Sequence, residues 1–146
     1  MTSDRVEDHE QLYRVAKPEF VGQDGRLKPS AFNDRYKRPS VDRAHLIGND
    51  PTQTHLYQPG DFVLQLLASD IREIPVLEEK DEKDRKLPDV FHKVDVEPVK
   101  EGHHAAHAEI FTTRVPNNGA STPTGVFKRL QIRLAEIARI LQITES

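Results

Sequence analysis

The last quarter of the chain carries the most regular apolar pattern in the sequence. Apolar residues recur there at steps of three or four, at Phe127, Leu130, Leu134, Ile137 and Leu141. An α-helix turns once in 3.6 residues, so this spacing places them on one helix face. Thr122 followed by Pro123 supplies an N-cap and a first-turn proline. We therefore predict a helix at about 123–142 that lies on a sheet, because the pattern is too short for a dimerising coiled coil.

Four other segments have the pattern expected of β-strands, at residues 12–16, 61–67, 93–97 and 107–113. The run at 61–67 is apolar on both faces, which indicates a central and well-buried strand. The segments at 12–16 and 93–97 alternate with a period of two. Together with the terminal helix they predict an α+β fold: a small mixed or antiparallel sheet of about four strands, packed by the C-terminal amphipathic helix.

The length and composition predict one domain with charged appendages. The chain has 146 residues, of which 36% are hydrophobic and 31% charged, so its core must be lean. Residues 1–10 hold four acidic side chains against one arginine, and nine charged residues follow one another at 78–86. We expect an acidic polar N-terminal tail at 1–10 and a single α+β domain at 11–142, with an exposed charged loop at 78–92.

Several classes of protein are excluded or disfavoured. The chain has no cysteine, so it cannot form a disulfide, a thiolate zinc site or an iron–sulfur cluster. No apolar run approaches the roughly 20 residues of a membrane-spanning helix, and the first residues are polar, unlike a signal peptide. The net charge of −3 is too small to imply a highly charged partner. We expect a cytoplasmic protein with no membrane association.

The densest group of reactive side chains lies at 101–110, in the sequence EGHHAAHAEI. His103, His104 and His107 are candidate metal ligands. If 107–113 is a strand, His107 and Glu109 share one face and offer two metal ligands or an acid–base pair. A third ligand would come from His104 or from a distant histidine, and no spacing singles one out. Ordinary polar residues at a strand end remain the simplest interpretation.

Two basic segments offer binding residues. Arg14 shares a strand face with apolar neighbours, which fits an edge strand facing water or a clamp for an anion or nucleotide. In the stretch at 37–43, Arg38, Asp42 and Arg43 are candidates to bind a phosphate or an acidic partner, and a solvated loop is the alternative. No nucleotide-binding glycine loop, esterase elbow or kinase motif is present.

Short motifs resemble those of a group of small bacterial proteins with no established activity. They are LYRV at 12–15, GRLKPSAF at 25–32, PSVDRA at 39–44 and AHAEI at 106–110. The resemblance spans about residues 12 to 140. It implies a bacterial origin and one compact domain, and it implies no mechanism.

The chain order Arg14, Ser40, Glu109 is also similar to the Arg–Ser–Glu order of one class of ADP-ribosyltransferase-like folds. That similarity implies that Arg14 grips the NAD phosphate and that Ser40 supports the nicotinamide ribose site. It also implies that Glu109 stabilises an oxocarbenium-like centre, where a negative charge helps.

Two hypotheses of function follow. The first is a non-enzymatic accessory module that acts by binding a partner protein. The sequence also leaves open whether the protein forms a homo-oligomer. The alternative is an enzyme that processes a nucleotide or nucleic acid, either ADP-ribosyltransferase-like or a metal-assisted hydrolase or nuclease. Its catalytic residues would be Arg14, Ser40, His107 and Glu109, and the question of a cofactor stays open. Convergence of these residues in one pocket would favour the enzyme.

Overall fold

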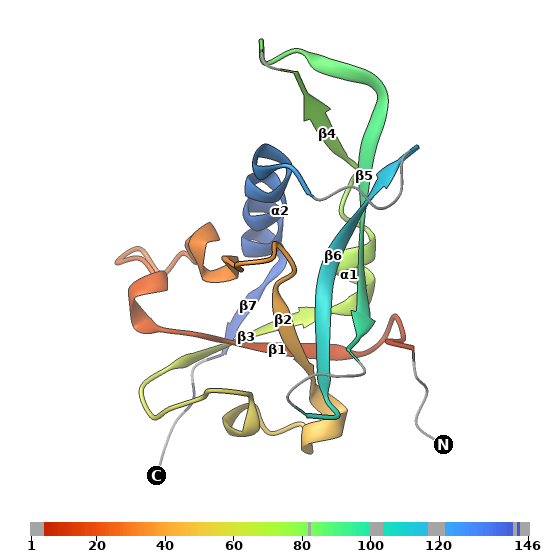
Figure 1. The fold of residues 1–146 in the computed structure, drawn as a ribbon. Coiled ribbons are helices and arrows are strands. Elements are labelled where there is room, and N and C mark those ends of the chain that lie inside the picture. The colour runs from red at the N-terminus through yellow and green to blue at the C-terminus, as the bar shows by residue number, and fades with distance from the viewer. Residues whose placement is uncertain (1–4, 82, 100–103, 117–121, 142, 144–146) are drawn as a thin grey trace.

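The computed structural model describes residues 5–81, 83–99, 104–116, 122–141 and 143. These residues form one seven-stranded sheet in the order β4-β5-β6-β2-β1-β3-β7, and every neighbouring pair is antiparallel (Figure 1). The strands are β1 (Gln11–Ala16), β2 (Ser40–Arg43), β3 (Phe62–Leu67), β4 (Leu77–Lys80), β5 (Lys86–Pro98), β6 (His107–Val115) and β7 (Arg139–Leu141). The α-helices are α1 (Ala68–Arg72) and α2 (Thr124–Ile137), and short 3-10 helices are η1 (Pro18–Phe20), η2 (Pro29–Phe32), η3 (Ala44–Ile47) and η4 (Pro51–Gln53).

The predicted α+β fold with about four strands is wrong, because the described chain is mostly β with seven strands. Strands β1, β3, β5 and β6 occupy the four segments predicted from the sequence. The sequence pattern does not reveal β2 and β7, which have only four and three residues. Strands this short are held by backbone hydrogen bonds to their neighbours, and they carry too few side chains to show a period.

The charged stretch at 78–92 forms a hairpin of β4 and the first half of β5, where an exposed loop was predicted. Asp81 closes the turn by accepting hydrogen bonds from the backbone N–H groups of Lys83 and Arg85. Lys86 and Glu78 form an ion pair of 3.1 Å across the two strands. Figure 1 shows this hairpin extending beyond the rest of the sheet. A projecting hairpin can be charged on both faces, because its backbone pairing does not require an apolar side.

Helix α2 begins at Thr124, close to the predicted start, and ends at Ile137, earlier than predicted. Its buried side chains are Val126, Phe127, Leu130 and Leu134. Beyond Ala138 the chain turns extended, and Leu141 pairs with Val63 at the edge of the sheet. The apolar period of the sequence therefore continues from a helix into a strand. Within the described residues, no helix is long and apolar enough to cross a membrane.

The two faces of the sheet differ in chemistry. One face carries the main core, in which side chains of six strands, β1 to β6, pack with Phe32, Leu130 and Leu134. On the other face, Ser40 lies opposite Glu109, and Asp42 lies opposite both His107 and Tyr13. Directly paired residues of an antiparallel sheet point to the same side. The pairing of β2 with its neighbours therefore assembles one polar face.

Strands β1 and β2 separate along their length. They pair only through Leu12 with Arg43 and Tyr13 with Asp42. Beyond that point, residues 14–16 of β1 pair only with β3, while Ser40 and Val41 pair only with β6. In Figure 1, β1 and β3 accordingly run across the view while β2 and β6 run nearly upright. The sheet opens into a wedge between β1 and β2.

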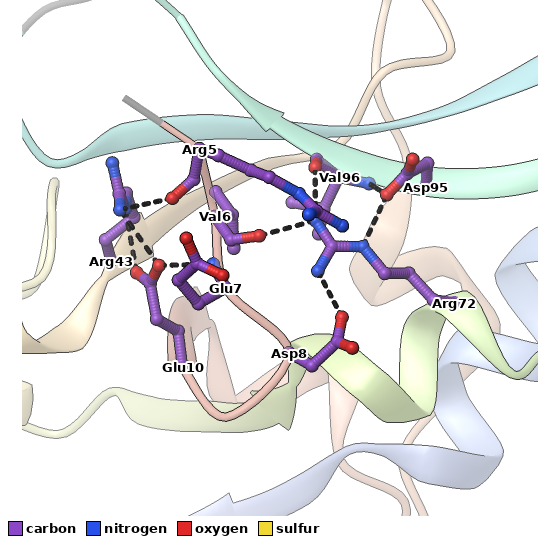
Figure 2. A network of polar contacts seen from close by, with 9 residues as sticks. All are labelled: Arg5, Val6, Glu7, Asp8, Glu10, Arg43, Arg72, Asp95 and Val96. Atoms are coloured by element: carbon purple, nitrogen blue, oxygen red, sulfur yellow. Dashed lines mark hydrogen bonds and ion pairs between the residues drawn. The ribbon is translucent and has the colours of Figure 1, made fainter. Parts of the chain in front are cut away.

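The described part of the predicted acidic tail packs against the sheet. Val6 is fully buried, and Glu10 is 5% exposed. Both carboxylate oxygens of Glu10 accept hydrogen bonds from Arg43, at 2.8 and 2.9 Å. Arg72 of α1 donates to the backbone carbonyls of Val6 and Val96 and forms ion pairs with Asp8 and Asp95 (Figure 2). Residues 5–10 thus form a strap held by two arginines.

Candidate functional site

A cavity of about 500 Å³ occupies the wedge between β1 and β2. Its lining includes Arg14, Lys17, Asn33, Ser40, Asp42 and His55. Pockets that bind small molecules measure about 300–1,000 Å³. The cavity is therefore large enough for a ligand the size of a nucleotide, and it lies where the strands leave their pairing.

Arg14 bridges the wedge. Its guanidinium donates to the backbone carbonyls of Ala31, Asn33 and Ser40 at 2.9, 3.0 and 2.8 Å, and it stacks over Phe32 at 5.6 Å. Burial lowers its pKa, and the charge of Asp34 opposes this effect. Among the residues that the structure describes, no carboxylate forms an ion pair with Arg14. A positive charge without a carboxylate partner thus lines the cavity.

The alternative of Arg14 on a water-facing edge strand is wrong. β1 lies between β2 and β3, inside the sheet. The position of Arg14 in β1 lies on the apolar face of the sheet. Its long side chain extends away from that face into the gap between β1 and β2. Arginine is seldom buried without a partner, and here three carbonyl oxygens provide the hydrogen bonds.

Ser40 and His107 form a hydrogen-bonded pair on the polar face. The Nε2 atom of His107 lies 3.2 Å from the Ser40 hydroxyl oxygen. His107 is 8% exposed, and burial lowers its pKa, against the raising effect of Glu109 and Asp42. The imidazole is therefore neutral near pH 7, the form that can take a proton from a hydroxyl group.

Asp42 organises the loops beside this pair. It is 2% exposed, and its Oδ1 lies 3.0 Å from His104 Nε2 while its Oδ2 accepts a hydrogen bond from the backbone N–H of His55. His104 Nδ1 accepts a hydrogen bond from the N–H of Ala106, so its proton is on Nε2 and faces Asp42. Asp42 lines the cavity and fixes two of its neighbouring segments.

Glu109 and Arg38 continue the polar face away from the cavity. Arg38 Nε lies 3.2 Å from Glu109 Oε1, and its Nη2 lies 2.7 Å from Glu97 Oε1. The same guanidinium lies over the ring of Phe111, 4.9 Å from its centre. Glu109 is held next to Ser40 by the β2–β6 pairing. Arg38 therefore fixes the carboxylate of the predicted catalytic residue.

One predicted site residue does not join this group, and another lies outside the described residues. Arg43 is buried on the opposite face and is occupied by the bidentate pair with Glu10, so it does not line the cavity. His103 lies outside the described residues. His104 and His107 are described, but no group of three or more histidine, aspartate or glutamate side chains in the described ranges is arranged to hold a metal ion.

Sequence reasoning missed most of the cavity lining, including the polar residues Lys17 and Asn33. Lys17 lines it and forms an ion pair of 2.7 Å with Asp61, and Asn33 contributes its backbone carbonyl to Arg14. No local pattern marks either residue, since both lie outside the strands that were predicted. Lys17 directly follows β1, whereas Asn33 reaches the wedge because η2 packs beside Arg14.

The structure thus brings Arg14, Ser40 and Asp42 to one cavity, with His107 and Glu109 on the adjoining face. No protein-family model, curated protein or solved structure matches the chain. The chemistry of this cavity is therefore the basis for inferring a function.

Proposed function

We propose that the protein is an enzyme that processes a phosphorylated substrate of nucleotide size in the cavity between β1 and β2. The observation that carries this proposal is the position of Arg14. Its partly buried charge feels the charge of Asp34 but forms no ion pair within the described residues, and it lies at the wall that also carries Ser40. A partly buried cation that forms no ion pair favours an anionic ligand.

Arg14 is suited to hold a phosphate as a fixed charge. Guanidinium has five N–H donors, and three carbonyl oxygens use three of them. The remaining donors are available to phosphate oxygens, which match the fork geometry of arginine. Because its carbonyl partners hold the side chain in place, little side-chain entropy is lost when the ligand binds.

Ser40 and His107 supply proton transfer beside that phosphate. A neutral imidazole next to a hydroxyl group is the arrangement of a general base and the group it activates. Glu109 adds a negative charge on the same face, next to Ser40 in the sheet. In the ADP-ribosyltransferase-like arrangement this carboxylate stabilises positive charge on the ribose, so NAD is the first substrate to test.

The test measures binding and turnover separately. Binding of NAD, ATP and GMP is measured by titration calorimetry, and turnover by release of nicotinamide or phosphate with and without Mg²⁺. We expect Ser40→Ala and His107→Gln to lower turnover by about 10²–10⁴-fold while the affinity changes little. Arg14→Lys should weaken binding instead, because a single ammonium cannot keep the carbonyl contacts and hold a phosphate.

Ser69→Ala is the matched control, because it removes a hydroxyl from α1, which does not line the cavity. It should leave both binding and turnover unchanged. The proposal is rejected if none of the nucleotides binds, or if Ser40→Ala and His107→Gln turn over substrate as fast as the unmodified protein.

The hypothesis of an accessory module that binds a partner protein stays a prediction. Two exposed apolar side chains, Val76 and Ile132, line one hollow between β4 and α2 and support it. If Ile132→Glu abolished the binding of a partner protein while the cavity stayed intact, the accessory-module hypothesis would be favoured. The cavity and its charge favour the enzyme.

A further inference from the structure

An exposed aromatic ring lies beside the polar face at residues 34–38. Tyr36 is 73% exposed. The guanidinium of Arg35 lies over this ring, 5.4 Å from its centre. Among the described residues, no carboxylate forms an ion pair with Arg35. The ring and the cation together form a preassembled stack that faces solvent.

The loop that carries Tyr36 is held rigidly. Asp34 accepts hydrogen bonds from the backbone N–H groups of Tyr36 and Arg38, at 2.8 and 3.0 Å. Lys37 has a φ of 61°, a conformation that is uncommon for a residue other than glycine. Its ammonium donates to the carbonyl of Thr122 at 2.6 Å, which ties the loop to the start of α2. These contacts hold the backbone of the loop that carries Tyr36.

A hollow of about 360 Å³ lies between this loop and β6. It is lined by Arg35, Tyr36, Lys37, Arg38, Phe111 and Thr112, together with Thr122. Phe111 carries the guanidinium of Arg38 on its ring, and the same guanidinium reaches Glu109. We call these seven residues the Tyr36 surface. It combines two aromatic rings with three basic side chains, of which Arg38 is paired with Glu97 and Glu109, while Arg35 and Lys37 form no ion pair within the described residues.

The Tyr36 surface is continuous with the proposed catalytic face. His107, Glu109 and Phe111 alternate along β6, so their side chains point to the same side. Successive members of this row are about 7 Å apart, two strand residues of about 3.4 Å each. A chain molecule that places one unit at Ser40 and His107 can therefore place a neighbouring unit on the Tyr36 surface.

We infer that the Tyr36 surface binds single-stranded nucleic acid, so that the substrate of the cavity is a nucleotide within or at the end of a strand. Bases stack on exposed aromatic rings regardless of sequence, and the backbone phosphates are attracted to lysine and arginine. Paired arginine–aromatic stacks strengthen this stacking through cation–π attraction. The inference rests on the proposed function for the role of the cavity, but the surface itself is testable alone.

The experiment measures fluorescence anisotropy of a labelled 12-nucleotide RNA and a DNA of the same sequence, mixed with the full chain at low salt. Tyr36→Ala should weaken binding at least about fivefold, and Tyr36→Phe should keep it, because stacking needs the ring and not the hydroxyl. Arg35→Gln should also weaken binding. The matched control is Arg26→Gln, which removes the same charge from an exposed loop away from the surface. Tyr36 and Arg35 are exposed, so their replacement leaves the core intact.

Each outcome decides the inference. It is overturned if neither oligonucleotide binds, if Tyr36→Ala binds as well as the unmodified protein, or if Arg26→Gln weakens binding as much as Arg35→Gln. The inference would also be overturned if polyglutamate, added at the same concentration of negative charge, displaced the RNA. That result would show that negative charge suffices for binding and that base stacking is not needed. Nucleotide binding in the cavity without strand binding leaves the proposed function standing and rejects the surface. Binding of the oligonucleotide that depends on Tyr36, without turnover in the cavity, supports the Tyr36 surface and rejects the proposed function.

Discussion

Three arginines show how a partly buried cation takes its role from its partners. Arg43 faces the two oxygens of Glu10, and Arg72 faces Asp8 and Asp95, so both charges are neutralised inside the protein. Within the part of the chain that the structure describes, Arg14 has only carbonyl oxygens as hydrogen-bond partners. Burial alone lowers the pKa of Arg14, while carboxylates outweigh burial and raise that of Arg72. The difference in partners separates a structural cation from a candidate ligand-binding one.

Two buried histidines predict how stability depends on pH. Burial lowers the pKa of both His92 and His107, so the folded protein resists their protonation. The unfolded chain takes up these protons below about pH 6.5, and stability is then lost as the pH falls from there toward the folded pKa values. We expect the free energy of unfolding to decrease between pH 7 and 5.5, by up to about 1.4 kcal/mol per pH unit for each histidine.

Urea denaturation at several pH values measures this slope. His92→Leu should flatten it, because His92 is 1% exposed and its Nε2 has no hydrogen-bond partner within the described structure. Glu79 Oε2 lies 3.8 Å from His92 Nε2 and raises the pKa of His92, whereas the charge of Arg114 lowers it. The two charges together therefore do not offset the lowering of the pKa by burial. An unchanged slope in His92→Leu would contradict the role assigned to this residue.

At the scale of elements, α2 illustrates how one apolar pattern serves two structures. Leu130 and Leu134 are fully buried, while Ile132 on the same helix is 48% exposed. The helix ends at Ile137, and Ile140 and Leu141 pair with β3 instead. A period of 3.6 predicts which side of a helix is buried, but it does not locate the residue at which the backbone becomes extended.

The helix provides a matched pair of substitutions. Leu134→Ala should lower the free energy of unfolding by about 2–5 kcal/mol, because it leaves a cavity in the core. Ile132→Ala should change it by less than about 1 kcal/mol, because its side chain is half in solvent. Thermal denaturation followed by circular dichroism measures both, and equal effects would show that α2 does not pack as described.

At the scale of the whole molecule, the N-terminal strap joins segments far apart in the sequence. Arg43 on β2 holds Glu10, and Arg72 on α1 holds the backbone of Val6 (Figure 2). Burial would raise the pKa of Glu10, but the hydrogen bonds from Arg43 and from the Glu7 backbone outweigh it and keep that pKa below its ordinary value. The carboxylate therefore stays ionised in the folded protein down to acidic pH, and its contribution to stability is lost as the pH falls through that lowered pKa.

Breaking the strap should destabilise the whole fold. Glu10→Gln leaves the buried Arg43 without its counter-charge, and we expect a loss of about 3–5 kcal/mol. The double variant Glu10→Leu with Arg43→Met should recover most of that loss, because it removes both charges. Chemical denaturation of the two variants tests this, and a single variant as stable as the unmodified protein would contradict it.

The sequence by itself determined the local elements with strong periods. Residues 12–16, 61–67, 93–97 and 107–113 fall within or across observed strands, and α2 begins within two residues of its predicted start. Each has enough alternating or helically spaced apolar residues to show which side faces the core. The sequence also singles out Ser40, His107 and Glu109 as candidates. Their side chains are of types that take part in catalysis, and His107 and Glu109 lie on one predicted strand.

Only the tertiary structure decided the sheet and the cavity. Strands β2 and β7 exist because longer neighbours supply their hydrogen bonds, and the β4–β5 hairpin exists despite its charge because pairing satisfies its backbone. The partners of Arg14 come from η2 and β2, and those of Arg43 from the strap. Whether an arginine meets a carboxylate or a carbonyl depends on contacts between distant segments, which no local pattern records.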